Sequence, residues 1–204
     1  MDTARYYVAL GMVVATMPIL FSWFLVHPFI EMWRRVGLWG TYVVIIGFIA
    51  IGIMALWSTR NLFLTVDFGF NVPLSVLAAV LLCGAMIIRT GWRKVLRPGT
   101  VLGIPEISGR RDRNELVTDG IYSVIRHPRY VEVGLGLLAA ALFSNYLASY
   151  VVVLGYVVFV YLVVLLEERE LRKRFGKEYE DYCSRVPRFI PRMRSRSPKR
   201  DGGK

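Results

Sequence analysis

Residues 133–166 read VGLGLLAAALFSNYLASYVVVLGYVVFVYLVVLL, and this run of 34 residues without a charged side chain is the longest apolar stretch of the chain. As one helix it would be about 50 Å long at ~1.5 Å per residue, which is too long for the ~30 Å hydrocarbon core of a bilayer. Ser144 and Asn145 interrupt the apolar residues near the middle of the run. The stretch therefore predicts a tight hairpin of two short membrane-spanning helices.

Three further charge-free runs precede this stretch, and each fits the ~20 residues of one membrane-spanning helix. They cover residues 6–26, 36–59 and 68–88 of a 204-residue chain that is 55% hydrophobic. The sequence thus predicts an all-α integral membrane protein with five transmembrane helices, of which the last two form the hairpin. We expect one domain over residues 1–192, made of a three-span part (1–92), a long cytoplasmic loop (93–129), the hairpin (130–166) and a cytoplasmic C-terminal helix (167–192), followed by a disordered tail (193–204).

The positive charge of the chain is concentrated on one side of the predicted spans. The formal net charge is +11, and of 26 Lys and Arg residues eight fall within 93–129 and thirteen within 169–204. Only Arg5 and Arg60 fall on the opposite side. This positive-inside pattern predicts an N-terminus outside, with the long loop and the C-terminus in the cytoplasm. It also favours membrane lipids over nucleic acid as the partner of this charge.

Several familiar catalytic signatures are absent from the sequence. No Gly-rich loop joins a strand to a helix, so neither a Rossmann fold nor a P-loop is predicted. The two histidines, His27 and His127, belong to no cluster with metal-ligand spacing, so no metal is expected. Cys83 lies within a predicted span and Cys183 in the cytoplasmic part, so the two are not expected to form a disulfide.

Two polar motifs remain, both at predicted cytoplasmic membrane boundaries: Arg126-His-Pro-Arg-Tyr130 and Glu167-Glu168. Arg126 can clamp a carboxylate or phosphate in a bidentate manner, and His127 can give or take a proton near neutral pH. The carboxylates can bind a ribose diol or an ammonium group. Simpler interpretations stay open, namely a basic turn against lipid headgroups for the first motif and a helical ion pair with Arg172 for Glu168.

Apolar side chains after the carboxylate pair follow a helical period. Leu171, Phe175, Tyr179 and Tyr182 recur three or four residues apart, which predicts one face of a helix near the membrane surface. Gly176 is expected to bend this helix.

Five short motifs between residues 116 and 192 carry a resemblance to a known family. They are Thr118-x-Gly120-x-Tyr122, Arg126-His-Pro-x-Tyr130, Glu167-Glu-x-x-Leu171, Phe175-Gly-x-Glu178-Tyr-x-x-Tyr182 and Val186-Pro-Arg-x-Ile-Pro191. In this order they resemble the C-terminal signature of isoprenylcysteine carboxyl methyltransferases and the related membrane phospholipid methyltransferases. The resemblance implies a bundle of membrane helices that binds S-adenosylmethionine at its cytoplasmic side.

The resemblance also implies roles for individual residues. The implied catalytic residues are Arg126, His127 and Glu168. The implied cofactor-binding residues are Gly120, Tyr122, Arg126, His127, Pro128 and Tyr130 on one wall, and Glu167, Glu168, Phe175, Tyr179 and Tyr182 on the other.

One position departs from the family pattern. The family usually has glycine two residues after the motif tyrosine, where this chain has Glu132. A carboxylate at the head of a span is costly unless it is paired or lies in a watery cavity. Glu132 is therefore predicted to pair with Arg129 or Arg126, or to line the site.

The expected function is methyl transfer from S-adenosylmethionine to a lipophilic acceptor. The acceptor would be the carboxyl group of a prenyl-cysteine-like substrate or a lipid head group. Two alternatives remain: an NADPH-dependent enzyme similar to membrane sterol reductases, which carry a similar Arg-His-Pro-x-Tyr segment, and a non-catalytic membrane protein that retains the fold.

Overall fold

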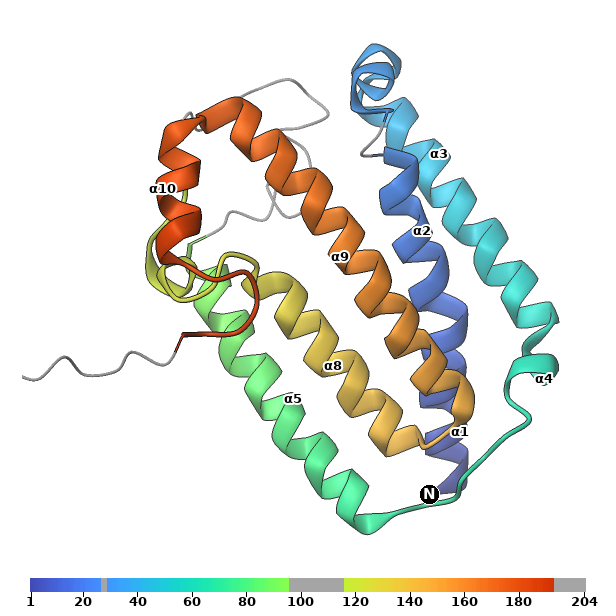
Figure 1. The fold of residues 1–204 in the computed structure, drawn as a ribbon. Coiled ribbons are helices and arrows are strands. Elements are labelled where there is room, and N and C mark those ends of the chain that lie inside the picture. Colours follow the sequence, from blue (N-terminus) through green and yellow to red (C-terminus); the bar gives the residue numbers. More distant parts are fainter. Residues whose placement is uncertain (27–28, 96–115, 193–204) are drawn as a thin grey trace, which may run out of the picture.

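A computed structural model describes residues 1–26, 29–95 and 116–192 (Figure 1). The predicted disordered tail, 193–204, and residues 96–115 of the predicted long loop lie outside this part of the chain. The elements in order are α1 (Asp2–Gly11), the π-helical turn η1 (Met12–Thr16), α2 (Met17–Val26), α3 (Ile30–Ser58), α4 (Arg60–Phe63), α5 (Val72–Arg93), the 3-10 turn η3 (Gly120–Ser123), α8 (Pro128–Ser144), α9 (Leu147–Phe175) and α10 (Lys177–Arg185).

The prediction of an all-helical protein is confirmed for the described residues, which form helices and turns and no β-strand. Four helical segments are long and apolar enough to cross a membrane: Asp2–Ser22, Leu38–Ser58, Val72–Arg93 and Leu147–Phe175. The sequence predicts five such spans. The difference lies in α8, whose 17 residues give about 26 Å at ~1.5 Å per residue, slightly less than the hydrocarbon core.

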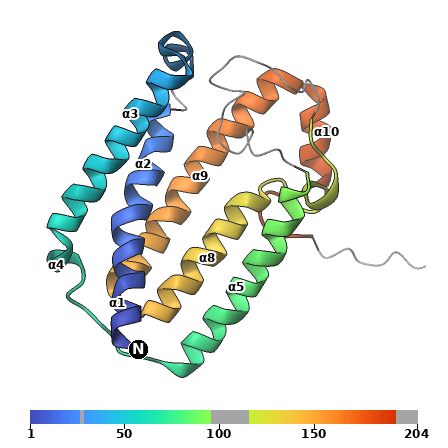
Figure 2. The same ribbon diagram turned by 180° about the vertical axis from the view of Figure 1, so that it is seen from behind.

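The long helices stand in a row, in the order α5, α8, α9, α2 and α3 (Figures 1 and 2). Core side chains from η1, α8 and α9 meet in the middle of the row, where Met12 and Val13 pack against Ala141 and Val152. The outer faces of α3 and α5 expose large apolar side chains such as Trp39 and Ile87. Such faces suit contact with lipid, and the chain is an integral membrane protein.

Pro18 explains the irregular first span. Proline has no backbone N–H, and its ring clashes with the carbonyl four residues earlier, here that of Val14. The helix accommodates this as the π-helical turn Met12–Thr16, immediately before α2. The Pro18 ring then lies so close to α3 that a Cβ at Gly52 would come within 2.9 Å of it.

Glycines end two other helical segments. Gly37 has φ 84° and divides α3 into a short helix and the span that follows. Gly176, with φ 53°, separates α9 from α10, so the predicted bend in the C-terminal helix is a full break. Both conformations favour glycine because a side chain is strained at positive φ.

A buried polar cluster holds the end of the bundle at which α8 turns into α9, the same end as the N-terminus (Figure 1). Asn145 adopts the left-handed conformation between the two helices, and its side-chain amide donates to the Gly69 carbonyl oxygen at 2.8 Å. Arg5 of α1 is fully buried, donates to the Ser144 carbonyl oxygen at 3.0 Å and pairs with Asp67. These bonds fix α1 and the 64–71 connection to the α8–α9 turn.

We expect Asp67→Asn to lower the stability of the protein markedly. Removing one partner of a fully buried ion pair costs about 3–5 kcal/mol of unfolding free energy. We expect a smaller loss here, about 2 kcal/mol, because the Asp67 side chain is 37% exposed and because Asp2 also pairs with Arg5. Thermal unfolding in detergent measures the loss. Asp2→Asn is the matched control: the Asp2 side chain is 85% exposed, so this variant should change the unfolding temperature little. Equal effects of both variants would contradict the account.

The same cluster predicts a dependence of stability on acid. Burial alone would raise the pKa of Asp67, but hydrogen bonds from the Gly69 N–H and from Arg5 hold that pKa below its ordinary value. Because the pKa is lower in the folded state, the stabilisation is complete above the unfolded pKa of about 3.9 and is lost as pH falls through the folded pKa. We expect Asp67→Asn to flatten the decline in unfolding temperature below about pH 4. An unchanged acid profile would refute this role of Asp67.

Candidate active site

The two polar motifs meet around one buried carboxylate. Glu168, on α9, is fully buried. Its Oε1 lies 2.9 Å from Nε of Arg188, 3.2 Å from a terminal nitrogen of Arg126 and 3.3 Å from Nε2 of His127. Its Oε2 lies 2.8 Å from a terminal nitrogen of Arg188 and 3.4 Å from one of Arg172. The predicted pairing with Arg172 is therefore present as one contact among several.

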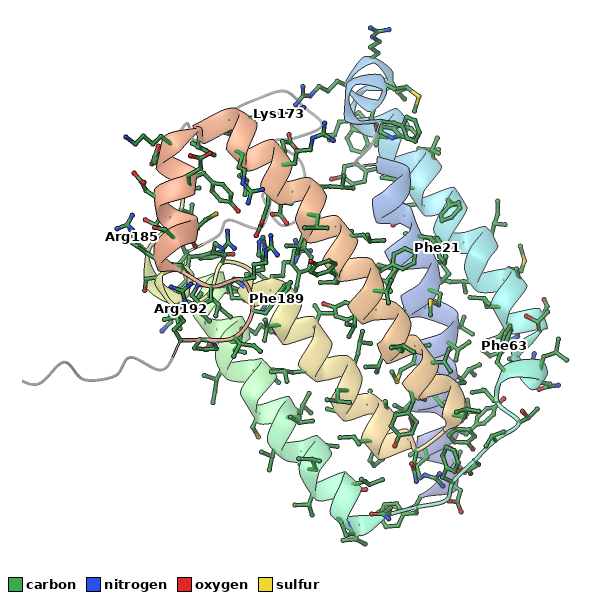
Figure 3. The ribbon with its side chains drawn as sticks, viewed as in Figure 1. Phe21, Phe63, Lys173, Arg185, Phe189 and Arg192 are labelled. Carbon is green, nitrogen blue, oxygen red and sulfur yellow. The ribbon has the colours of Figure 1, made fainter. Side chains whose placement is uncertain are left out.

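The chain after α10 closes this cluster by returning to the start of α8. The backbone N–H groups of Arg126 and His127 donate to the carbonyl oxygens of Pro187 and Arg188, at 2.9 and 3.1 Å. Pro128 then begins α8, as proline can in the first turn of a helix, where its missing N–H is not needed. Figure 3 shows the returning segment, with Phe189 and Arg192 labelled, passing the first turn of α8. Because the segment after α10 returns in this way, the Arg188 side chain lies next to Glu168.

Positive charge exceeds negative charge in the cluster. Three guanidinium groups, those of Arg126, Arg172 and Arg188, surround Glu168, and Glu167 is the second carboxylate nearby. The hydrogen bonds from Arg188 to Glu168 raise the pKa of the Arg188 guanidinium above its ordinary value. The Arg126 side chain is 8% exposed, and its Nε has no hydrogen-bond partner among the described residues. Arg126 therefore keeps one hydrogen-bond donor that none of the described residues uses.

Tyr130 separates this polar cluster from an apolar pocket. Its hydroxyl donates to Oε2 of Glu167 at 3.1 Å, and the same Glu167 oxygen lies 3.8 Å from Nδ1 of His127. Tyr130 also lines an apolar pocket of about 150 Å³. The pocket residues come from α2, α8 and α9: Ile19, Leu20, Arg129, Tyr130, Val133, Tyr156, Phe159, Val160 and Val163.

The predicted aromatic wall packs into a core of its own. Tyr179 and Tyr182 of α10 are buried, and Phe175 packs against them. The Tyr182 hydroxyl donates to the Tyr122 carbonyl oxygen at 2.6 Å, and burial raises the pKa of Tyr182 to about 12. Gly120, with φ 61°, starts the turn that carries Tyr122. These residues fasten α10 beside the cluster around Glu168.

The structure therefore brings the predicted residues to one end of the bundle, in two groups. Arg126, His127, Tyr130, Glu167 and Glu168 form the polar cluster. The aromatic group around Tyr179 lies beside this cluster. Arg126 connects the two groups, because its guanidinium lies over the Tyr179 ring and donates a hydrogen bond to Sγ of Cys183.

Sequence reasoning assigned no role to Arg188 or Phe189. The sequence does draw attention to Arg188 through its place in the Val186-Pro-Arg motif. Its bidentate bond to Glu168, however, forms only because the segment after α10 returns to the start of α8. Phe189 lies against the His127 ring, with ring centroids 5.9 Å apart. Glu132 lies 3.9 Å from Arg89 of α5, a neighbour that the sequence did not suggest. Among the described residues no group of three His, Cys, Asp or Glu side chains is arranged to hold a metal ion.

Fold and site together define a helical membrane protein with a buried ionic cluster at one end of the bundle and an apolar pocket beside it. The family model for phospholipid methyltransferases matches residues 73–178, just over half of the chain. The chain belongs to this family, which confirms the resemblance seen in the motifs.

The matches to individual relatives cover less than half of each relative's own length. A cobalt-zinc-cadmium resistance protein of Cupriavidus metallidurans is 40% identical over 88 residues, covering 43% of this chain and 40% of the relative. The protein-S-isoprenylcysteine O-methyltransferase of Schizosaccharomyces pombe is 34% identical over 87 residues, covering 42% and 37%. A Delta(14)-sterol reductase of Mus musculus is 31% identical over 140 residues, covering 58% and 32%. The chain thus spans about two fifths of the length of the first curated relatives that it matches. No solved structure gives a significant match.

We expect Arg188→Ala to release the segment that closes the cluster. The variant removes two charge-assisted hydrogen bonds to Glu168, and bonds to charged groups contribute about 1.5–3 kcal/mol. The amides of Arg126 and His127, which donate to this segment, should then exchange hydrogen at least about tenfold faster. Hydrogen-exchange mass spectrometry measures this. Arg185→Ala, an exposed change within α10, should leave both amides as protected as before, and equal exchange in the two variants would contradict the role of Arg188.

Proposed function

We propose that this protein is an S-adenosylmethionine-dependent methyltransferase that acts on a lipophilic acceptor at the end of the bundle formed by α8, α9 and α10. The observation that carries the proposal is the position of Tyr130. Its hydroxyl binds Glu167 in the ionic cluster, while its ring lines the apolar pocket. A charged, water-soluble methyl donor and an apolar acceptor can therefore bind on either side of one side chain.

The residues of the cluster fit the cofactor chemically. S-adenosylmethionine supplies a methyl group on a positively charged sulfur, already activated for transfer. Arg126, whose Nε has no hydrogen-bond partner within the described part of the chain, suits the carboxylate of the cofactor, as does the surplus of positive charge around it. Glu167, whose side chain is 39% exposed, suits the ammonium group or the ribose diol.

The protein residues then serve mainly to position the reactants and exclude water. Holding two reactants in the right geometry can contribute about 7–11 kcal/mol. We assign a positioning role to Glu168, because guanidinium groups occupy both of its oxygens and it orients Arg126 and His127. A carboxylate acceptor needs no base, whereas for an amine or alcohol acceptor His127 is the candidate base.

Topology and orientation complete the proposal. We propose α8 as a fifth membrane-crossing helix, since its 17 residues lie beside the spans α5 and α9. The positive-inside pattern of the sequence supports a cytoplasmic location for the cluster around Glu168. The soluble cofactor then reaches the site from the cytoplasm, and the acceptor reaches it from the bilayer.

Cofactor binding provides the direct test. We expect calorimetry in detergent to detect binding of S-adenosylmethionine, and Arg126→Ala to weaken that binding at least tenfold, since a lost charge-assisted contact costs about 1.5–3 kcal/mol. Arg169→Ala removes an exposed arginine next to Glu168 and should leave the affinity unchanged. Absence of binding, or stabilisation by NADPH in place of S-adenosylmethionine in a thermal-shift assay, would overturn the proposal.

Activity is tested separately. Membranes incubated with methyl-labelled S-adenosylmethionine should incorporate label into a lipid-extractable product, which mass spectrometry can identify. A prenyl-cysteine-like methyl ester and an N-methylated head group are the two products considered. A folded protein that binds the cofactor and transfers no label to lipid-extractable material would be a non-catalytic member of the family.

A further inference from the structure

Cys183 of α10 lies against the guanidinium group of Arg126. A terminal nitrogen of Arg126 donates a hydrogen bond to Sγ of Cys183, and the Arg126 side chain is 8% exposed. Cys183 itself is partly exposed and packs beside the buried side chains of Tyr179 and Tyr182. Reactive cysteines are those that lie beside a cationic side chain and remain accessible to a reagent. Cys183 meets both conditions.

The second cysteine of the chain has different surroundings. Cys83 lies in the middle of the span α5, within the charge-free stretch 68–88, and it is exposed on the surface of that helix. Chemistry that depends on a neighbouring cation is therefore expected at Cys183 and not at Cys83.

Two side chains beside the sulfur of Cys183 carry a buried donor that has no acceptor among the described residues. The donors are Nε of Arg126 and the hydroxyl of Tyr179, a residue that is 1% exposed. Tyr179 and Cys183 are four residues apart on α10, so their side chains are neighbours on one face of the helix. Burial raises the pKa of the Tyr179 hydroxyl, and the nearby Glu168 carboxylate and Cys183 thiol raise it further. The hydroxyl therefore faces the sulfur and the ionic cluster.

An oxygen atom bonded to Sγ of Cys183 would give these donors an acceptor. A sulfenic acid, the first and reversible product of cysteine oxidation, carries such an oxygen. It forms when the sulfur attacks one oxygen of hydrogen peroxide, so that an S–O bond forms while the O–O bond breaks. The displaced hydroxide takes the thiol proton and leaves as water. The sulfur loses two electrons and the peroxide gains them, so the reaction needs no other reactant.

We propose that Cys183 is a modification site for hydroperoxides, and that the sulfenic oxygen formed there binds the donors of Arg126 and Tyr179 and thereby blocks the binding of the cofactor. In the proposed function Arg126 binds the carboxylate of S-adenosylmethionine, so the oxidised cysteine and the cofactor compete for one side chain. The block rests on the proposed function, whereas the modification of Cys183 does not.

The reactivity of Cys183 tests the site. The full-length protein with Cys83→Ala, which keeps Cys183 as its one cysteine, is treated in detergent with hydrogen peroxide and dimedone, a reagent that traps sulfenic acids. Peptide mass spectrometry follows the labelling over time. We expect labelling to be at least about tenfold faster in the folded protein than in the same protein unfolded in urea and sodium dodecyl sulfate. Equal rates would overturn the site.

A substitution of each neighbour tests its role. Arg126→Met removes the guanidinium group and should abolish most of the difference in rate between the folded and the unfolded protein. Arg185→Ala removes an exposed arginine of the same helix (Figure 3) and should leave that difference in place. Equal labelling of these two variants would overturn the role of Arg126.

Tyr179→Phe deletes only the hydroxyl and keeps the buried ring in place. The sulfenic acid is formed first, the peroxide is removed with catalase, and free cysteine is then added to reduce the sulfenic acid. We expect it to persist for a time about fivefold shorter in this variant, because one hydrogen bond to its oxygen is lost. Dimedone added at intervals measures the remaining fraction. An unchanged lifetime would overturn the role of the Tyr179 hydroxyl.

Calorimetry tests the block of cofactor binding. We expect peroxide to weaken the binding of S-adenosylmethionine at least about tenfold, as the loss of Arg126 does, and dithiothreitol to restore it. Restoration also shows that the oxidised protein is folded. Cys183→Ala should have the same affinity before and after peroxide, whereas Cys83→Ala should remain sensitive. Undiminished binding in a protein whose Cys183 is fully oxidised would overturn the block.

The outcomes separate this inference from the proposed function. Rapid labelling of Cys183 in a protein that does not bind S-adenosylmethionine would support the modification site and overturn the proposed function together with the block. Binding of the cofactor to a protein whose Cys183 resists peroxide would support the proposed function and overturn the modification site.

Discussion

The buried carboxylate of Glu168 sets the arrangement of one end of this protein. An ion removed from water costs several kcal/mol unless opposite charges and hydrogen bonds compensate for it. Here the compensation comes from separate parts of the chain: Arg126 and His127 before α8, Arg172 on α9 itself and Arg188 after α10. Each depends on the others, because a missing partner leaves a buried charge exposed to the same cost. The start of α8, the end of α9 and the returning segment are therefore held together.

The pairing of Arg188 with Glu168 also brings a polar and an apolar region of the protein into contact. The segment that carries Arg188 to Glu168 also brings Phe189 onto the apolar cluster of Tyr156, Val160 and Val164. Tyr130 completes the boundary, with its hydroxyl on Glu167 and its ring in the pocket. A methyltransferase for lipophilic acceptors needs such a boundary, since its two substrates differ in polarity. Membership of the phospholipid methyltransferase family agrees with this division.

Each end of the bundle is held by its own polar cluster. At the end with the N-terminus, Arg5 joins α1 to the α8–α9 turn through Ser144 and Asp67. At the other end the ionic cluster joins α8, α9 and α10. Among the described side chains, none from α2 belongs to either cluster, and α2 follows a π-helical turn.

The sequence by itself determined the helical membrane class, the break at Ser144-Asn145 and the two polar motifs, because charge-free length and residue chemistry are local properties. It also pointed to the family through the order of short motifs. Tertiary structure alone decided that Arg188 binds Glu168, that α8 has only 17 residues, that Glu132 lies near Arg89 and that Tyr130 divides a polar from an apolar site. These features arise from segments far apart in the chain, and the cost of burying a charge or a polar group acts only once those segments have packed together.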